Sequence, residues 1–444
     1  VSLGASLLTG LYPAVRSAGG NLAQDLKDGG RSPGFGGGGF RSSLVVAQVA
    51  LSIVLLVGAG LLIRSLTRMG AVHPGFEAES MLTFDIELPL SRYPDAGART
   101  GFYSELLSGL RAIPGVSSVA MTSNLPIRHR GNTFRARVPG TEGEGERVFL
   151  RGILPGYFEA MGIPVLMGSG FQTEHRTATI SLIDAYLDGT ETQPNREAPG
   201  VVVISESMAR VSFPDENPLG RQLELEFFGT PRRLEVVGVV GDVRLTALEL
   251  DPENALYLPH FQFATGRMGI ALRTDAPLSS LAGLVRDAVR RVDRNIPVVG
   301  LSTLEHDIAE SMAHRRVAAL ALSLYALLPL LLAGAGLYAV VAYYVAQRSH
   351  EIGVRMALGA DSMRIGALIL RRGAALVCGG IGIGLAGALG LTRLIRGMLF
   401  GVEPTDPGTF LAVTAFVLLV AIGACAVPTW RAVSSDPKVA LRAL

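Results

Sequence analysis

Four long apolar runs and one long polar stretch dominate the pattern of hydrophobic and polar positions. The apolar runs contain no charged residue and no histidine, and they cover residues 44–63, 317–346, 374–391 and 409–427. A helix that crosses the hydrocarbon core of a bilayer, about 30 Å thick, needs about 20 such residues. We therefore predict four transmembrane helices, the first over residues 41–63, because four charge-free runs are difficult to explain in a soluble helical core.

The polar stretch between the first two runs, residues 64–316, has the strand and helix patterns of a large α+β domain. A strand, an amphipathic helix and a second strand are predicted twice, over residues 81–88, 99–113 and 116–121, and again over residues 268–272, 279–292 and 298–301. In each helix the apolar residues recur at spacings of three and four, which places them on one face. The pattern indicates two βαβ-like halves, over about 77–135 and 265–312, unless the similarity of two short units is a coincidence.

Between these halves, residues 136–264 are predicted to form an inserted strand-rich module. Alternating or β-branched runs cover residues 201–204, 222–228 and 233–240, and turn residues separate them. Residues 175–199 are polar and show no such period, so we expect a long surface loop there.

Basic residues predict the orientation of the helices. The N-terminal segment, the loop 347–373 and the C-terminal segment carry most of the arginines and lysines near the helix ends, whereas the loop between the third and fourth helices has only Arg393 and Arg396. The positive-inside rule then places the first three in the cytoplasm and residues 64–316 outside. Four arginines at the ends of the soluble stretch oppose this assignment, namely Arg64, Arg68, Arg315 and Arg316. Long domains, however, translocate largely regardless of charge.

Composition narrows the classes of function. Only 18% of the residues are charged, against roughly 25% in soluble domains, and the net charge of +2 argues against a strongly basic nucleic-acid binder. The two cysteines, Cys378 and Cys425, lie inside apolar runs and exclude a disulfide framework. The sequence contains no P-loop motif and no H-E-x-x-H, and its seven histidines are scattered. We therefore expect no catalytic residue, no metal and no cofactor; the uncharged helices also argue against ion-coupled secondary transport.

The loop after the second helix carries the most specific motif, QRSHEIGVRMALGA at residues 347–360. We predict a short helix over residues 349–358, in which Glu351 and Arg355 form a favourable i,i+4 pair beside an apolar stripe of Ile352 and Met356. Such a helix suits docking into a groove on a partner. Spacing alone leaves open a solvated interfacial helix without a partner.

The motif resembles the R-x-x-E-I-G-[IV]-R-x-A-L-G-A signature of the MacB/FtsX-like permeases of ABC transporters. The order of one helix, a large extracytoplasmic domain and three helices is similar too, over essentially residues 40–444. The likeness is greatest to the duplicated orphan permeases first noted in acidobacteria. It implies that residues 64–316 are a MacB-like periplasmic core domain, that residues 317–444 are an FtsX-like permease domain, and that the loop contacts an ATPase. The implied coupling residues are Arg348, Glu351, Ile352, Val354, Arg355, Met356 and Leu358.

A second repeat agrees with duplication. Residues 11–27 align without a gap with residues 426–442, so that Pro13 matches Pro428 and Arg16 matches Arg431. In both copies an apolar stretch ends at proline and a basic tail follows. We hypothesise that residues 1–40 are the end of a preceding permease unit and a cytoplasmic linker, and that the chain is the C-terminal part of a longer protein.

Two features of the helices bear on mechanism. The run 317–346 would be about 45 Å long at 1.5 Å per residue, which exceeds the membrane core, and Pro329 within it is either a hinge or a tolerated membrane proline. In the third helix Gly380, Gly384 and Gly387 have a spacing that allows close helix packing, although the same glycines could face lipid.

The resemblance implies a permease subunit of an ABC-type efflux, export or lipoprotein-release-like system in the bacterial inner (plasma) membrane. The implied partners are a separate cytoplasmic ABC ATPase, a second permease unit in the same chain or in a homodimer, the lipid bilayer, and a periplasmic adaptor or hydrolase. Neither an enzyme nor a nucleic-acid binder is expected. The alternative is a non-transporting mechanotransmitter or scaffold that regulates a periplasmic partner.

Overall fold

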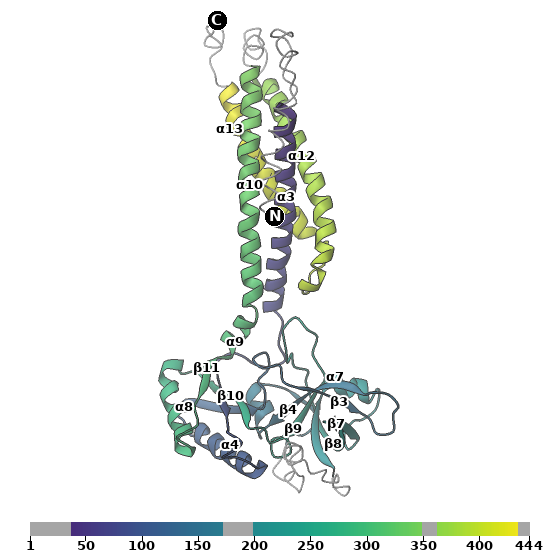
Figure 1. Cartoon of the computed structure of the whole chain (residues 1–444), viewed down its shortest axis with the longest axis vertical. Coiled ribbons are helices and arrows are strands. Elements are labelled where there is room, and N and C mark those ends of the chain that lie inside the picture. Colours follow the sequence, from purple (N-terminus) through teal and green to yellow (C-terminus); the bar gives the residue numbers. More distant parts are fainter. Residues whose placement is uncertain (1–36, 172–198, 349–361, 434–444) are drawn as a thin grey trace. The chain divides into compact units, whose positions relative to one another are not determined.

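The computed structural model describes residues 37–171, 199–348 and 362–433, and it divides into two compact units (Figure 1). Residues 63–318 form the soluble unit, and the helices before and after it form the membrane unit. Three predicted features fall wholly or partly outside the described residues. They are the surface loop 175–199, of which residue 199 is described, the terminal repeat, of which residues 426–433 are described, and the coupling helix 349–358.

The membrane unit contains the four predicted apolar helices. They are α3 (Gly37–Gly70), α10 (Ala313–Gln347), α12 (Ser362–Leu394) and α13 (Pro407–Val433), with a short 3₁₀ turn η2 (Arg396–Met398) between the last two. Each is long and apolar enough to cross a membrane, which confirms the four predicted helices. All four extend beyond the charge-free runs, because polar turns continue each helix at its ends. The start of α13 is capped by Asp406, whose Oδ2 accepts from Thr409 N at 2.8 Å.

The helix α3 is the most enclosed of the four. Half of its apolar window (50%) is buried within the unit, against 22% for α10 and for α12 and 11% for α13. Residues of α3 at a spacing of four line its packed face, namely Val45, Val49, Ile53, Val57 and Leu61. They pack against buried residues of the other three helices, which leave wide apolar faces uncovered by the protein.

The soluble unit is built on one large sheet. Its strands in the described residues are β1 (Met81–Glu87), β2 (Val116–Thr122), β3 (Thr133–Arg137), β4 (Glu146–Ile153), β5 (Val165–Gly168), β6 (Gly200–Ser205), β7 (Gln222–Phe227), β8 (Thr230–Val240), β9 (Ala255–Pro259), β10 (Arg267–Thr274) and β11 (Val299–Thr303). Its helices there are α4 (Ala96–Arg111), α5 (Tyr157–Met161), α7 (Glu206–Ser212), α8 (Leu278–Val292) and α9 (Leu304–Ser311).

The predicted strand–helix–strand order is present in both segments, β1-α4-β2 and β10-α8-β11, but the two segments interleave. The strand order is β11-β1-β10-β2, so β10 lies between β1 and β2, and every neighbouring pair is antiparallel. This is the split-βαβ arrangement, in which each crossover skips one strand. The boundaries that we predict for two halves and an inserted module therefore stay predictions, since the sheet continues from β2 into β4 through the pair Thr122–Ile153.

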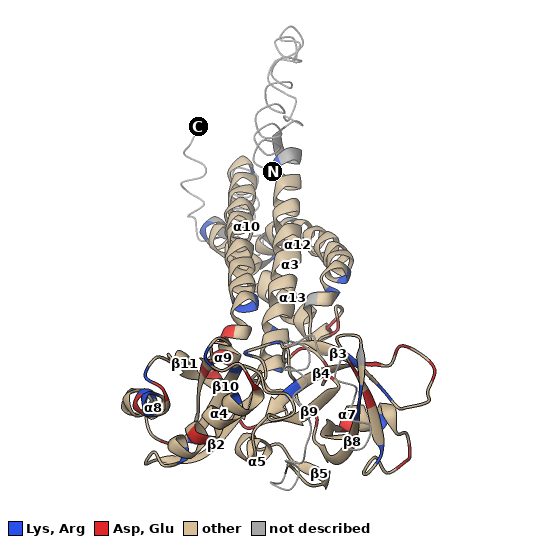
Figure 2. Ribbon diagram, turned by 60° about the horizontal axis from the view of Figure 1, so that its bottom comes forward, with Lys and Arg blue, Asp and Glu red and all other residues tan. Residues whose placement is uncertain are grey.

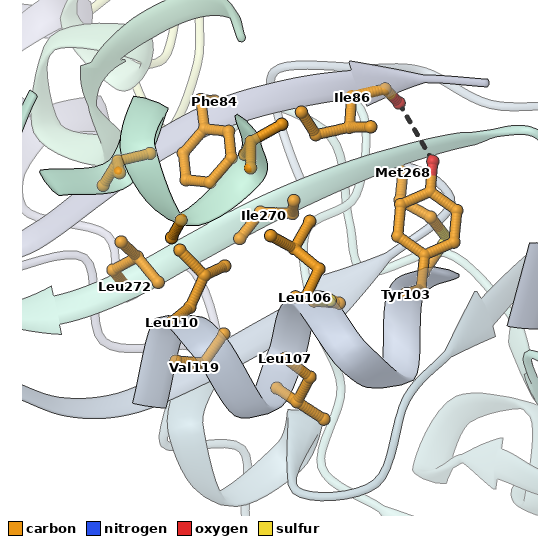
Figure 3. Close-up of a cluster of buried hydrophobic side chains, with 14 of the residues drawn as sticks. Phe84, Ile86, Tyr103, Leu106, Leu107, Leu110, Val119, Met268, Ile270 and Leu272 are labelled. Atoms are coloured by element: carbon orange, nitrogen blue, oxygen red, sulfur yellow. Dashed lines mark hydrogen bonds between the residues drawn. The ribbon is translucent and has the colours of Figure 1, made fainter. Parts of the chain in front are cut away.

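Apolar side chains of α4, α8 and these strands form one core (Figure 3). Leu106 and Leu110 of α4 point into this core, as the helical period predicts, and share it with Ile86, Ile270 and Leu272 of the sheet. Tyr103 is buried in the same core, and its hydroxyl lies within hydrogen-bond distance of two backbone oxygens, that of Gly266 at 2.7 Å and that of Ile86 at 3.2 Å, to which it can donate its one proton. The buried phenol is thereby satisfied.

The strand-rich remainder closes on itself. From β4 the order runs β4-β3-β7-β8-β6-β9, and β9 pairs with β4 in parallel, which completes a six-stranded barrel. Alternate residues fill its interior, for example Leu223, Leu225 and Phe227 on β7 and Leu256 and Leu258 on β9. Closure pairs each barrel strand on both sides, and β5 pairs with Gly238–Val240 of β8, which extend past β7.

Candidate functional site

Of the predicted coupling residues, only Arg348 falls within the described residues. It follows directly on α10, and its guanidinium lies over the ring of Tyr344, 4.9 Å from the ring centroid. The other six, Glu351, Ile352, Val354, Arg355, Met356 and Leu358, lie outside the described residues, and their role stays a prediction.

The predicted glycine face of α12 lies against α3. A Cβ added to Gly380 would be 2.7 Å from Cβ of Val49, and one added to Gly384 would be 2.9 Å from Cβ of Ile53. At Gly387 the nearest atom would be 3.2 Å away, on Val54. Real Cβ contacts are longer, so the first two positions admit only glycine at this helix separation.

The neighbouring glycines on α12 face elsewhere. A Cβ at Gly379, Gly382 or Gly390 would meet nothing within 4 Å inside the protein. The stripe is therefore one-sided, and it separates a packed face from an open one.

Pro329 lies inside α10, which continues as a helix on both sides of it. Proline lacks the N–H that would bond the carbonyl one turn earlier, on Tyr325, so the helix is locally weaker there. Ala326 and Leu330 beside it are buried. A hinge at this position remains a prediction.

A second site lies in the soluble unit, at the loop that follows β2. The guanidinium of Arg128 donates from Nε and Nη2 to Oδ2 of Asp85 on β1, at 3.1 Å each, and from Nη1 to Oδ2 of Asp307 on α9, at 2.8 Å. It also donates to Thr83 Oγ1 at 3.1 Å and to the backbone oxygen of Gly300. We call these five residues the Arg128 junction.

The junction is fitted closely. Gly300 has φ of +62°, and a Cβ there would overlap Nη2 of Arg128, so this position requires glycine. Thr83 donates to the same Asp307 oxygen at 2.8 Å. Burial lowers the pKa of Arg128, but the hydrogen bond to Asp307 and the charges of both aspartates raise it more, so the net shift is upward and the guanidinium stays charged.

Hydrogen bonds to other segments fix the loop after β2 that carries Arg128. Ile127, with φ of +64°, donates from its backbone N to Leu245 O at 2.8 Å. The fully buried Arg151 of β4 donates to Arg130 O at 3.1 Å, and its guanidinium lies 5.8 Å from the ring centroid of Phe149. Burial lowers the pKa of Arg151. These bonds fix the loop, and therefore Arg128, relative to the barrel.

The junction contacts the segment that leads into α10 through Asp307. The helix α9 begins at Thr303, whose Oγ1 accepts from His306 N at 3.2 Å, and it ends at Met312, after which α10 starts. A second ion pair lies just beyond, between Arg315 and Glu249 at 2.7 Å. Two ion pairs thus join this segment to loops of the soluble unit.

Sequence reasoning missed the junction. Asp85 is separated from Arg128 by 43 positions and Asp307 from it by 179, so no local motif unites them. The available signal was Asp85 itself, a carboxylate inside the buried part of a strand. Arg315, which opposed the predicted orientation, has its own partner within the soluble unit, Glu249.

Among the described residues, no three His, Cys, Asp or Glu side chains lie together as metal ligands, and both cysteines are free thiols. Charged residues are concentrated on the soluble unit, whereas the four described helices are charged mainly near their ends (Figure 2).

Comparison with known proteins identifies the family. A family model described as the MacB-like periplasmic core domain matches residues 42–291, and the FtsX-like permease C-terminal model matches residues 323–437. The chain belongs to this family of membrane permeases of ABC transporters, with a periplasmic domain like that of MacB.

Its relatives include several proteins named macrolide export ATP-binding/permease protein MacB. The one from Rhodospirillum rubrum is 25% identical over 362 residues, which are 77% of this chain and 48% of that protein. The one from Aggregatibacter actinomycetemcomitans is 30% identical over 177 residues, 37% of this chain and 26% of that protein. The chain spans about half the length of the first of these relatives.

A solved structure, the periplasmic region of MacB from Actinobacillus actinomycetemcomitans, is 17% identical to this chain. It covers 54% of this chain and 94% of its own, with a TM-score of 0.32.

Proposed function

We propose that the chain is the permease subunit of an ABC-type export or lipoprotein-release-like system, in which a separate cytoplasmic ATPase moves a periplasmic domain. The family and the export function in the names of the relatives support this proposal. The observation that carries it is the connection around α10. One continuous helix, Ala313–Gln347, leads into the predicted coupling loop at its C-terminal end. At its N-terminal end it follows α9, which the Arg128 junction holds.

The chemistry of such a subunit is mechanical. The ATPase would dimerise on ATP and displace the loop 349–358, and α10 would pass the displacement on along its axis. A helix resists axial stretching because each turn is hydrogen-bonded to the next. The ion pairs Arg128–Asp307 and Arg315–Glu249 would then move strands β1 and β11 and the loop around residue 249 with the helix, rather than letting α9 slip.

The test uses the predicted coupling loop. The double substitution Glu351→Arg with Ile352→Asp reverses the charge and removes the apolar stripe. We expect the variant to reach the membrane but to lose co-purification with its ATPase and the ATPase's stimulation. The matched control is Arg393→Glu with Leu394→Asp, which makes comparable changes on the predicted outer side and should leave both unaffected. A double variant that still binds and stimulates the ATPase normally would show that the coupling role is wrong.

Transport and regulation can be separated in the same system. If the wild-type permease and its ATPase hydrolyse ATP together, and cells without the permease accumulate a lipid, peptide or drug, the chain is an exporter. If ATP hydrolysis instead controls a cell-wall hydrolase and no compound is moved, the chain is a mechanotransmitter. Both fit helices without ionisable groups in their central turns, and a hydrolase gene beside the chain's own gene would favour the second.

A further inference from the structure

A basic groove lies at the C-terminal end of α8, in the soluble unit and apart from the Arg128 junction. It is open to solvent, has a volume of about 530 Å³ and is lined mainly by polar side chains of two segments. Arg290, Arg291 and Arg294 come from the end of α8 and the turn after it, and Arg92 comes from the loop before α4. Ligand pockets typically have volumes of about 300–1,000 Å³, so the groove is large enough for a small anion and its substituent.

The one carboxylate in the groove is already engaged. Asp293 Oδ2 accepts from the hydroxyl of Tyr93 at 2.9 Å and pairs with Arg92 at 3.2 Å. Its Oδ1 accepts from the backbone N of Asn295 at 2.9 Å and from that residue's side-chain amide at 3.3 Å. The backbone hydrogen bond from Asn295 is the main cause that lowers the pKa of Asp293, which keeps this carboxylate charged.

Asp293 therefore serves as a scaffold for the groove. It links the end of α8 to the loop of Arg92, and Tyr93 anchors that loop through an edge-to-face contact with Phe102, with ring centroids 5.4 Å apart. Four arginines against one aspartate leave a net charge of +3.

The side chains of the other three arginines are exposed to solvent. Within the described residues, Arg290, Arg291 and Arg294 form no ion pair with a carboxylate, although Arg291 Nε donates to the backbone oxygen of Asp287 at 3.3 Å. Cations at a helix C-terminus interact favourably with the helix dipole, which accounts for one or two of the arginines at the end of α8. That effect does not account for Arg92, which a separate segment brings to the same groove.

We propose that this groove binds a phosphoryl group, either of a soluble phosphate compound or of a lipid headgroup. Guanidinium groups are planar and donate in pairs, which matches the oxygens of phosphate. A phosphoryl group offers more acceptor oxygens, and at neutral pH more charge, than a carboxylate. Three arginines with free donors and a net charge of +3 therefore favour phosphate over a carboxylate.

The experiment uses the full chain in neutral detergent micelles and two soluble probes, inorganic pyrophosphate and dibutanoyl phosphatidic acid, in titration calorimetry. We expect saturable binding of at least one probe. Arg290→Ser with Arg294→Ser should weaken it about tenfold, since two charge-assisted contacts are lost. Arg290→Lys with Arg294→Lys keeps the charge and the helix, and should retain part of the affinity.

The matched control is Arg210→Ser with Arg221→Ser. It removes the same charge from exposed positions that already pair with Glu206 at 3.2 Å and Glu216 at 2.9 Å, and it should leave binding unchanged. Binding of pyrophosphate alone would assign the groove to soluble phosphates, and binding of phosphatidic acid alone would assign it to lipid headgroups. The absence of saturable binding, or an equal loss in the control, would overturn the proposal.

Discussion

Replacing Arg128 by methionine tests whether the Arg128 junction holds α9 in place. Methionine keeps the length of the side chain but removes the charge and all donors. Asp85 and Asp307 would then share a partly desolvated space without their cation, and Asp307 would keep only the hydrogen bond from Thr83 at 2.8 Å. Release of α9 from the sheet would allow water to reach both carboxylates.

The magnitude follows from the burial of the three groups. The side chains of Arg128, Asp85 and Asp307 are 12%, 11% and 8% exposed. Removing one partner of a fully buried ion pair costs about 3–5 kcal/mol. Arg128 and Asp307 also line an open, solvent-accessible pocket with Gly300 and His306, so we expect about 2–4 kcal/mol here. That range corresponds to a roughly 30- to 900-fold increase in the population with α9 released.

Hydrogen–deuterium exchange of the full chain, read by mass spectrometry, measures this directly. Backbone amides of residues 304–311 should exchange faster by about that factor, because exchange there reports local opening. Peptides from α4 and β2 should be unchanged, since their apolar core contains none of the five junction residues. Tryptophan fluorescence would not serve, because the single tryptophan, Trp430, is in α13.

Two variants sharpen the test. Arg128→Lys keeps the charge but cannot reach Asp85, Asp307 and Gly300 together, so its effect should be intermediate. Arg221→Met removes an exposed pair with Glu216 and should change exchange at residues 304–311 by less than about twofold. If Arg128→Met left exchange over 304–311 at the wild-type rate, the junction would not hold α9, and the mechanical part of the proposed function would lose its basis.

Two further predictions concern the membrane helices and pH. Gly384→Val should destabilise the packing of α12 on α3 by about 1–3 kcal/mol, seen as a lower melting temperature of the detergent-solubilised chain, because its Cβ would be 2.9 Å from Ile53. Gly382→Val, whose Cβ would meet nothing within 4 Å, should have little effect, and equal losses in both would contradict one-sided packing. For His260, burial lowers the pKa from 6.5 to about 4, so the unfolded chain takes up a proton that the folded chain resists as the pH falls. The contribution of His260 to the free energy of unfolding is complete above pH 6.5 and is lost as the pH falls from 6.5 to 4, by about 3 kcal/mol in all. In calorimetric unfolding, the stability of His260→Gln should therefore fall less steeply with acid than that of the wild type. An equally steep fall in the variant would refute this prediction.

Much of the local structure was predictable because it depends on local periodicity. Apolar residues alternate with polar ones over residues 81–88, and they recur at helical spacing over residues 99–113. These segments form β1 and α4, whose ends lie within three residues of the predicted ends. The glycine spacing of Gly380 and Gly384 indicated close packing and left open what faced it; the structure places α3 there. The Arg128 junction was not predictable, since its members are far apart in sequence and a single arginine carries no spacing.

The sequence by itself determined the four apolar helices, the α+β character of the soluble unit and the motif at residues 347–360. Helix length, residue period and a contiguous motif are properties of neighbouring residues, so they can be read without a fold. Only the tertiary structure decided that β10 lies between β1 and β2, that β9 closes a barrel on β4, and that Arg128 meets Asp85 and Asp307. Those pairings require distant segments to be brought together, and which segments meet is settled by the burial of the whole core.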